Sequence, residues 1–185
     1  MRYLALLLAI MIATPVAAQV KLDLYNHAPP IVDYARSGDV EGVRGALANG
    51  ASPNSQDLDG VPAILLAASS GYANVVEALA RAKARLDVRD KNGNTPLIVA
   101  AERGYDGVVE ALIAAKANLN ADNRSGATPL IVAARAGNLG IVDMLVKAGA
   151  EVDRQDFTGR TALGWATTNS RRNVVERLRK AGATR

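Results

Sequence analysis

The sequence predicts an all-α repeat solenoid of about five units, because several features recur with one period of 33 residues. Glycines recur at this spacing, an Asp or Asn stands three residues before each of them, and apolar positions follow in helical register. The recurring positions are Gly60, Gly93, Gly126 and Gly159; Asp57, Asp90, Asn123 and Asp156; and Val75, Val108, Ile141 and Val174. Units of this length cannot bury an apolar face alone, so we expect them to stack.

The period also divides the chain. Projecting the repeated positions backwards predicts a degenerate first unit, and the last unit stops short of a full period. The predicted units are an N-terminal capping repeat over 30–56, full repeats over 57–89, 90–122 and 123–155, and a C-terminal capping repeat over 156–185. Residues 19–29 have no period and end at a double proline, so we expect an extended lead-in there.

Unit 90–122 shows the local pattern that the units share. A turn is expected over 90–93, since its final glycine accepts a positive φ at little cost. Thr95 suits an N-cap and Pro96 suits the first helical position, so a short helix is expected to begin there. A second helix is expected over about 106–115.

The recurring acidic residues have two interpretations. A row of carboxylates resembles a calcium site, but a 33-residue spacing places one residue on each successive turn. Asp and Asn at such positions accept hydrogen bonds from nearby backbone amides. We therefore interpret Asp57, Asp90 and Asp156 as structural caps rather than as metal ligands.

Two segments carry a known signature. Residues 95–101 and 128–134 both read T-P-L-I-V-A-A, which resembles the T-P-L-H-x-A motif of the ankyrin repeat, a family that also has a 33-residue period. By this resemblance, 30–185 is identified as a member of the ankyrin-repeat family. The resemblance implies an L-shaped stack in which hairpin fingers project from helix pairs. It also implies binding of other macromolecules through the fingers and the concave inner helix face.

The chain departs from the family pattern at two kinds of position. The usual histidine of the motif is replaced by Leu65, Ile98, Ile131 and Gly164. Lys83 and Lys116 stand where other units have glycine, and each would cost roughly 1 kcal/mol in a left-handed conformation. We therefore expect the second and third units to be locally looser than 123–155.

No constellation for catalysis, metal binding or cofactor binding is predicted. The sequence has no cysteine and one histidine, His27, which we interpret as a solvated residue of the lead-in. A Cys–His pair or a Ser–His–Asp triad would need this single histidine, and no His/Cys metal cluster is present. The expected function is non-enzymatic, with no cofactor.

Residues 1–18 predict a secretory signal peptide cleaved after Ala18. A positive start is followed by an apolar run that is too short to span a bilayer, which needs roughly 20 residues. We expect export to the bacterial periplasm, with secretion as the alternative, and we disfavour an uncleaved anchor. The remaining chain has 21 Lys and Arg against 18 Asp and Glu once Arg2 is removed, a mild excess that does not indicate nucleic-acid binding.

The exposed positions implied by the resemblance are more basic than the chain as a whole. We expect a monomer that binds a protein partner, and an acidic one suits this charge. The candidate partner-binding residues are Lys91, Arg103, Arg124, Arg135, Phe157 and Arg160.

The aromatic residues receive different interpretations. Phe157, the only Phe, is either a contact for the partner or a side chain packed on the neighbouring hairpin. Trp165 is expected in the core because other units have Leu or Val at its position. Tyr72 and Tyr105 are expected to shield helix ends.

The C-terminal unit carries a second basic cluster. Its residues are Arg171, Arg172, Arg177, Arg179, Lys180 and Arg185. We favour a solubilising cap, and contact with an anionic membrane surface is the alternative. Three functions remain open: an exported adaptor, an inhibitor or immunity-type protein that occludes one secreted enzyme or toxin, and an envelope scaffold held by the basic C-terminus.

Overall fold

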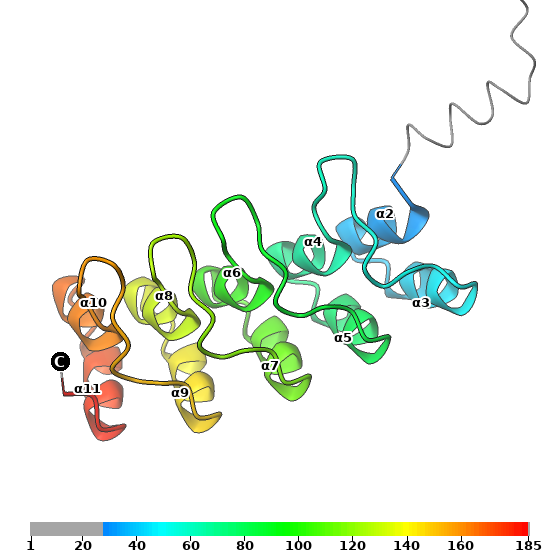
Figure 1. The fold of residues 1–185 in the computed structure, drawn as a ribbon. Coiled ribbons are helices and arrows are strands. Elements are labelled where there is room, and N and C mark those ends of the chain that lie inside the picture. Colours follow the sequence, from blue (N-terminus) through cyan, green and yellow to red (C-terminus); the bar gives the residue numbers. More distant parts are fainter. Residues whose placement is uncertain (1–27, 185) are drawn as a thin grey trace, which may run out of the picture.

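The computed structural model describes residues 28–184, so the predicted signal peptide, most of the lead-in with His27, and Arg185 lie outside the described residues. Within this range ten helices form five helix–turn–helix pairs (Figure 1). The pairs are α2 Pro30–Ser37 with α3 Val40–Ala48, α4 Ala63–Ser70 with α5 Ala73–Arg81, α6 Pro96–Arg103 with α7 Asp106–Ala114, α8 Pro129–Ala136 with α9 Leu139–Lys147, and α10 Ala162–Thr168 with α11 Arg172–Lys180.

The helices lie in two rows. The first helix of each pair belongs to an inner row, the second to an outer row, and the finger loops project beside the inner row (Figure 1). Each inner helix packs on the inner helix of the next repeat, and the outer helices do the same. The only β-pairing in the described part of the chain is an isolated bridge between Gln56 and Pro62. The predicted all-α solenoid is confirmed.

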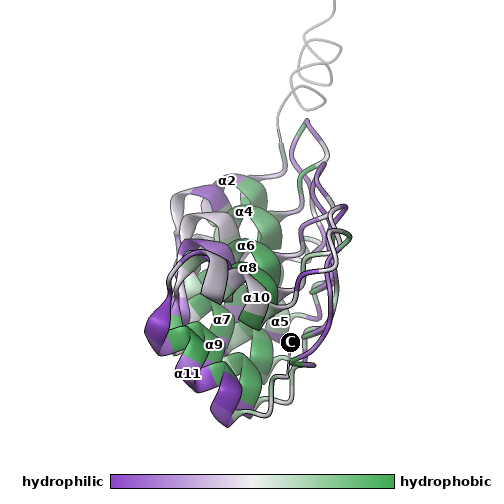
Figure 2. Cartoon of the chain, turned by 90° about the vertical axis from the view of Figure 1, so that its left-hand side faces the viewer, coloured by the Kyte–Doolittle hydropathy of each residue, from purple (hydrophilic) through white to green (hydrophobic). Residues whose placement is uncertain are grey.

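The core lies between the rows and between neighbouring repeats. The inner helices contribute small residues that allow close approach, and the outer helices contribute fully buried leucines. These residues are Ala67, Ala100, Ala133 and Ala166, and Leu79, Leu112, Leu145 and Leu178. Hydrophobic segments run along the helix rows from end to end in Figure 2, whereas much of the finger loops and of α11 is hydrophilic.

Helix boundaries follow the predicted capping residues. The Thr95 and Thr128 hydroxyls each accept a hydrogen bond at 3.3 Å from the amide three residues later, and Thr161 does so at 3.2 Å. Pro62 stands at the corresponding position of the second repeat, so α4 has no side-chain cap. The inner helices α2, α4, α6 and α8 end at a left-handed glycine.

A ladder of side-chain to backbone hydrogen bonds links consecutive repeats. Asn54 Oδ1 accepts the Arg85 amide at 2.8 Å, and Asp87 Oδ1 accepts the Asn118 amide at 3.0 Å. Asn120 and Asp153, one and two periods after Asp87, accept the amides of Glu151 and Thr184 in the same way. Sequence reasoning missed this ladder, although Asn or Asp recurs every 33 residues at these positions.

The tyrosines shield helix ends as expected. A Cβ added to Gly38, which ends α2, would lie 2.8 Å from the ring of Tyr72. A Cβ added to Gly71, which ends α4, would lie 3.2 Å from the ring of Tyr105. Each ring therefore covers the end of the inner helix of the preceding repeat.

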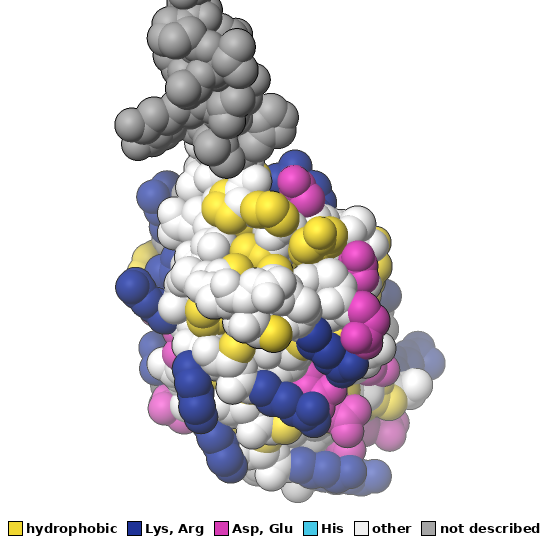
Figure 3. Space-filling model, turned by 90° about the vertical axis from the view of Figure 1, so that its right-hand side faces the viewer, with side chains coloured by type: hydrophobic (Ala, Val, Ile, Leu, Met, Phe, Trp, Pro, Cys, Tyr) yellow, Lys and Arg dark blue, Asp and Glu magenta, His cyan; other side chains and the backbone are white. Residues whose placement is uncertain are grey.

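The two ends of the stack differ in polarity. At the N-terminal end, Tyr34 covers Gly42, and a shallow groove of about 570 Å³ is lined mainly by apolar and glycine residues of α2 and α3. Figure 3 looks onto this end and shows hydrophobic side chains gathered on it. The C-terminal end presents the basic helix α11. The polar outer face expected of a terminal repeat is therefore developed at the C-terminal end only.

The two lysines that replace glycine adopt the left-handed conformation. Their φ values are 66° for Lys83 and 69° for Lys116, and Gly149 has a φ of 92° at the same repeat position. Ser170, with a φ of 56°, is a third such residue that sequence reasoning missed. A side chain costs about 1–2 kcal/mol in this region because its Cβ approaches the carbonyl oxygen.

We predict that Lys83→Gly and Lys116→Gly each raise the free energy of unfolding by about 0.5–1 kcal/mol, after the entropy cost of glycine is deducted. Urea denaturation measures the change. Gly149→Lys is the matched control and should lower the free energy by a similar amount, since no other group lies within 4 Å of an added Cβ there.

Amide exchange should be faster in 57–122 than in 123–155, and equal protection would contradict the proposed looseness.

Candidate partner-binding surface

Each finger is held by its recurring Asp or Asn. Asp90 Oδ1 accepts the amides of Asn92 at 2.7 Å and Asn94 at 2.8 Å. Asp57, Asn123 and Asp156 make the same pair of bonds in their own fingers. The interpretation as structural caps is confirmed, and no group of three or more potential metal ligands occurs among the described residues.

The last three fingers are joined by backbone hydrogen bonds. The amide of Arg124 donates to the carbonyl of Asn92 at 3.0 Å, and that of Phe157 donates to the carbonyl of Ser125 at 3.0 Å. Within the described chain, the equivalent bond from Lys91 to Asp59 is absent. The fingers that begin at residues 90, 123 and 156 therefore form one platform, which we call the finger platform, and the finger at 57 stands apart from it.

The glycines of the platform are needed for close approach as well as for positive φ. A Cβ on Gly93 would lie 3.0 Å from the backbone nitrogen of Arg124, and one on Gly126 would lie 2.8 Å from that of Phe157. A Cβ on Gly60, in the separate finger, would meet only Gln56 of its own loop. Glycine at 93 and 126 thus allows the next finger to pack.

Phe157 packs on the neighbouring finger and is still largely exposed. Its Cδ1 atom would lie 2.6 Å from a Cβ added to Gly126, so one edge of the ring rests on the neighbouring finger. The residue is nevertheless 75% exposed. Leu58, at the same repeat position in the separate finger, is 70% exposed and is a second apolar candidate that the sequence list of candidates omitted.

The predicted cations differ in availability. Lys91 and Arg124 are exposed, and their side chains have no hydrogen-bond or ion-pair partner within the described chain. Arg103 is also exposed, but its Nη1 donates to the carbonyl of Ser69 and so caps the last turn of α4. Asn169 makes the equivalent bond to the carbonyl of Arg135 at 2.9 Å. Arg103 is therefore partly a structural residue.

The expectation that Trp165 belongs to the core is met only in part, because Trp165 packs against the buried cluster but stays partly exposed. Leu66 and Val99 at the same repeat position are also partly buried, whereas Val132 at that position is only 1% exposed. Its ring carries two guanidinium groups, with the Cζ atoms of Arg160 and Arg135 at 4.7 Å and 5.7 Å from the ring centroid. The structure thus brings two predicted residues together around one that was not predicted as a site residue.

Asp156 holds the ring of Trp165 in place by a hydrogen bond. Its Oδ2 accepts the indole N–H of Trp165 at 2.6 Å, and its Oδ1 accepts a bond from the Thr158 hydroxyl at 2.6 Å and bonds from the Thr158 and Arg160 amides. Burial raises the pKa of Asp156, but these hydrogen bonds outweigh it and hold the pKa below its ordinary value. The carboxylate is therefore a structural anion. It orients the ring that the two arginines cover.

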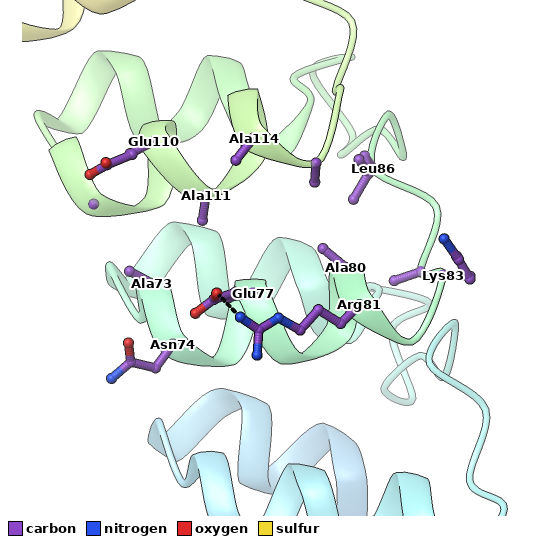
Figure 4. A pocket seen from close by; sticks show the side chains of 13 residues that line it. Ala73, Asn74, Glu77, Ala80, Arg81, Lys83, Leu86, Glu110, Ala111 and Ala114 are labelled. Carbon is purple, nitrogen blue, oxygen red and sulfur yellow. Dashed lines mark hydrogen bonds and ion pairs between the residues drawn. The ribbon is translucent and has the colours of Figure 1, made fainter.

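A separate groove lies on the outer row between α5 and α7 (Figure 4). It has a volume of about 810 Å³ and is lined largely by alanines, with an ion pair of 2.6 Å between Glu77 and Arg81 at its side. Neither His nor Cys lines it, and its acidic residues are Glu77 and Glu110. Small residues on the facing helix surfaces account for the groove without a ligand.

The ankyrin-repeat family model matches residues 31–123 and 108–184, which together span nearly all of the described chain. The chain belongs to the ankyrin-repeat family. Ankyrin repeats are typically protein–protein interaction modules without catalytic activity, and the arrangement of exposed fingers beside a helix row agrees with such a role. No curated protein matches the chain at a significant level. No helix of the described chain is long and apolar enough to cross a membrane.

We predict that Asp156→Asn weakens the dependence of stability on acid pH. Because the folded pKa of Asp156 lies below its unfolded value of about 3.9, its contribution is present above about pH 4 and is lost as pH falls through the folded pKa. The wild-type chain should therefore lose more unfolding free energy than the variant between about pH 5 and pH 2. Urea denaturation at several pH values measures this.

Asp59→Asn is the control for this prediction. The side chain of Asp59 is exposed and accepts no hydrogen bond in the described part of the chain. Its variant should follow the wild-type pH profile. Identical profiles for Asp156→Asn and wild type would contradict the structural role given to the Asp156 carboxylate.

Proposed function

We propose that the chain is a non-enzymatic adaptor that binds an acidic segment of a protein partner along the finger platform and the adjoining inner helices. The observation that carries this proposal is the set of exposed cations on the platform. Lys91, Arg124 and Arg160 have no ion-pair partner among the described residues, and the exposed Phe157 lies among them.

Two other arginines on this side form ion pairs within the molecule. Arg36 pairs with Asp57 at 2.7 Å, and Arg135 pairs with Glu102 at 2.7 Å. The platform cations, together with Arg103 of the inner row, are therefore the charges on this side that no ion pair offsets. Complementary charge speeds the encounter with a partner and orients it, while an exposed aromatic ring supplies apolar contact.

Fingers that are already joined favour binding, because the backbone then loses little conformational entropy when a partner binds. Backbone hydrogen bonds already join the three fingers, so the backbone positions that carry the exposed side chains are set before a partner arrives. The same surface would serve an inhibitor that occludes one secreted enzyme. An adaptor and an inhibitor differ in whether the bound partner keeps its activity.

The basic C-terminal helix supports a scaffold role as the alternative. Arg179 and Lys180 are exposed and lack partners in the described chain, whereas Arg177 is held by Asp143 at 2.6 Å. Exposed cations at the end of the stack would attract anionic lipid headgroups, and this attraction would weaken as salt screens it. A pair of variants with equal charge change separates the two surfaces.

We predict that Lys91→Glu with Arg124→Glu abolishes capture of native partners by the tagged mature chain, measured by quantitative mass spectrometry of the bound fraction. Arg179→Glu with Lys180→Glu changes the net charge equally and should leave capture unchanged. All four side chains are exposed without partners in the described chain, so folding should be unaffected. Loss of capture in the second pair alone would contradict the platform assignment and favour the C-terminal cluster.

We also propose export, with cleavage after Ala18 and a periplasmic or secreted mature chain. The support is the order of a positive start, a short apolar run and small residues in 1–18. Expression of the full chain with a C-terminal tag should yield a protein beginning at Gln19 outside the cytoplasm, by fractionation and intact-mass measurement. A product that retains residues 1–18 would contradict the proposal.

A further inference from the structure

We propose that Arg135 and Arg160, arranged over the ring of Trp165, form a carboxylate clamp that binds a Glu or Asp side chain of an extended acidic segment in the protein partner. The inference rests on the proposed function and names the anchor within that surface. We call Arg135, Arg160 and Trp165 together the clamp.

The clamp is assembled from three separate elements. Arg135 lies in the last turn of α8, Arg160 ends the final finger, and Trp165 lies in α10. The guanidinium carbons lie 5.7 Å and 4.7 Å from the ring centroid. An aromatic face attracts a guanidinium group and restricts its motion, so both cations are positioned before a ligand arrives.

The ring itself is held in place. Its N–H donates to Asp156 Oδ2 at 2.6 Å, and Asp156 is only 8% exposed. The Asp156 oxygens accept bonds from Thr158 and from the Arg160 amide as well as from the indole. These donors use both oxygens of the carboxylate, and within the described chain it forms no ion pair with either arginine of the clamp.

Donors remain available on both arginines. Arg135 uses Nη2 to contact Glu102, which leaves most of its five N–H donors unused by that ion pair. The Arg160 guanidinium makes no ion pair or hydrogen bond within the described chain, and the residue is exposed. Two oriented guanidinium groups suit a carboxylate, whose paired oxygens accept parallel N–H bonds.

The surroundings favour a peptide over a polyphosphate chain. Glu102 lies beside Arg135 with half of its side chain exposed, so a dense row of negative charge would be repelled there. Phe157 lies in the same finger turn as Arg160, and its exposed ring offers an apolar contact. A segment that carries an acidic residue near an apolar one matches both features.

Trp165 is the only tryptophan in the chain, so its fluorescence reports directly on the clamp. The probe is a synthetic octapeptide made of four consecutive Glu-Leu pairs. It is titrated into the mature chain up to about 1 mM. We expect a saturable change in Trp165 emission. Arg160→Gln and Arg135→Gln should each weaken binding about tenfold, the loss expected from removing a charge-assisted hydrogen-bonded contact.

Two controls separate the clamp from general charge attraction and from misfolding. Arg160→Lys keeps the charge but lacks the planar fork, so it should weaken binding nearly as much as Arg160→Gln. Arg81→Gln alters an arginine on the outer helix α5 and should bind as wild type. Urea denaturation of each variant verifies that it is folded under the titration conditions.

Several outcomes would overturn the clamp. They are an unchanged emission up to the highest peptide concentration, equal affinity in the wild type and both Gln variants, equal affinity for a peptide with Gln in place of Glu, or tighter binding of inorganic tripolyphosphate. If the clamp variants retain peptide affinity while Lys91→Glu with Arg124→Glu still abolishes partner capture, the proposed function stands and the clamp fails. If capture is unaffected by the platform variants, the proposed function fails whatever the peptide does.

Discussion

Apolar contact between neighbouring repeats is the constraint on which the rest of the structure depends. A pair of helices of eight or nine residues each encloses no core of its own. Alanines of the inner row and leucines of the outer row are fully buried where neighbouring repeats pack against each other. The ladder between repeats follows, because Asn54 and Asp87 can reach the amides of the next repeat only at that close spacing.

The fingers show how local and inter-repeat constraints combine. The recurring Asp or Asn shapes each turn by accepting two amides, and this would happen in any single repeat. Joining the fingers into a platform requires more, because glycine must also admit the backbone of the following finger at positions 93 and 126. The finger at 57 has the same turn but lacks the backbone bond, and Asp57 instead pairs with Arg36 of the first repeat.

Trp165 illustrates why one repeat position can change role along the stack. Val132 at this position belongs to the buried core and Leu66 packs against it, whereas the larger indole packs against the core and stays partly exposed. Its polar N–H requires an acceptor, which Asp156 supplies from the turn nine residues earlier. The exposed part of the ring then gathers Arg135 and Arg160, so a change made in one repeat organises side chains from two.

The sequence by itself determined the repeat architecture, the helix boundaries, the turn-capping role of the Asp and Asn residues, and the two repeat positions at which Lys83 and Lys116 replace glycine. These features depend on residues close in sequence or on one fixed period, and both are visible without coordinates. The tertiary structure decided which cations are available, because the bonds from Arg103 to Ser69 and from Arg135 to Glu102 join residues 34 and 33 positions apart. It also decided that two arginines contact the ring of Trp165. That contact depends on the size and orientation of the side chains rather than on periodicity.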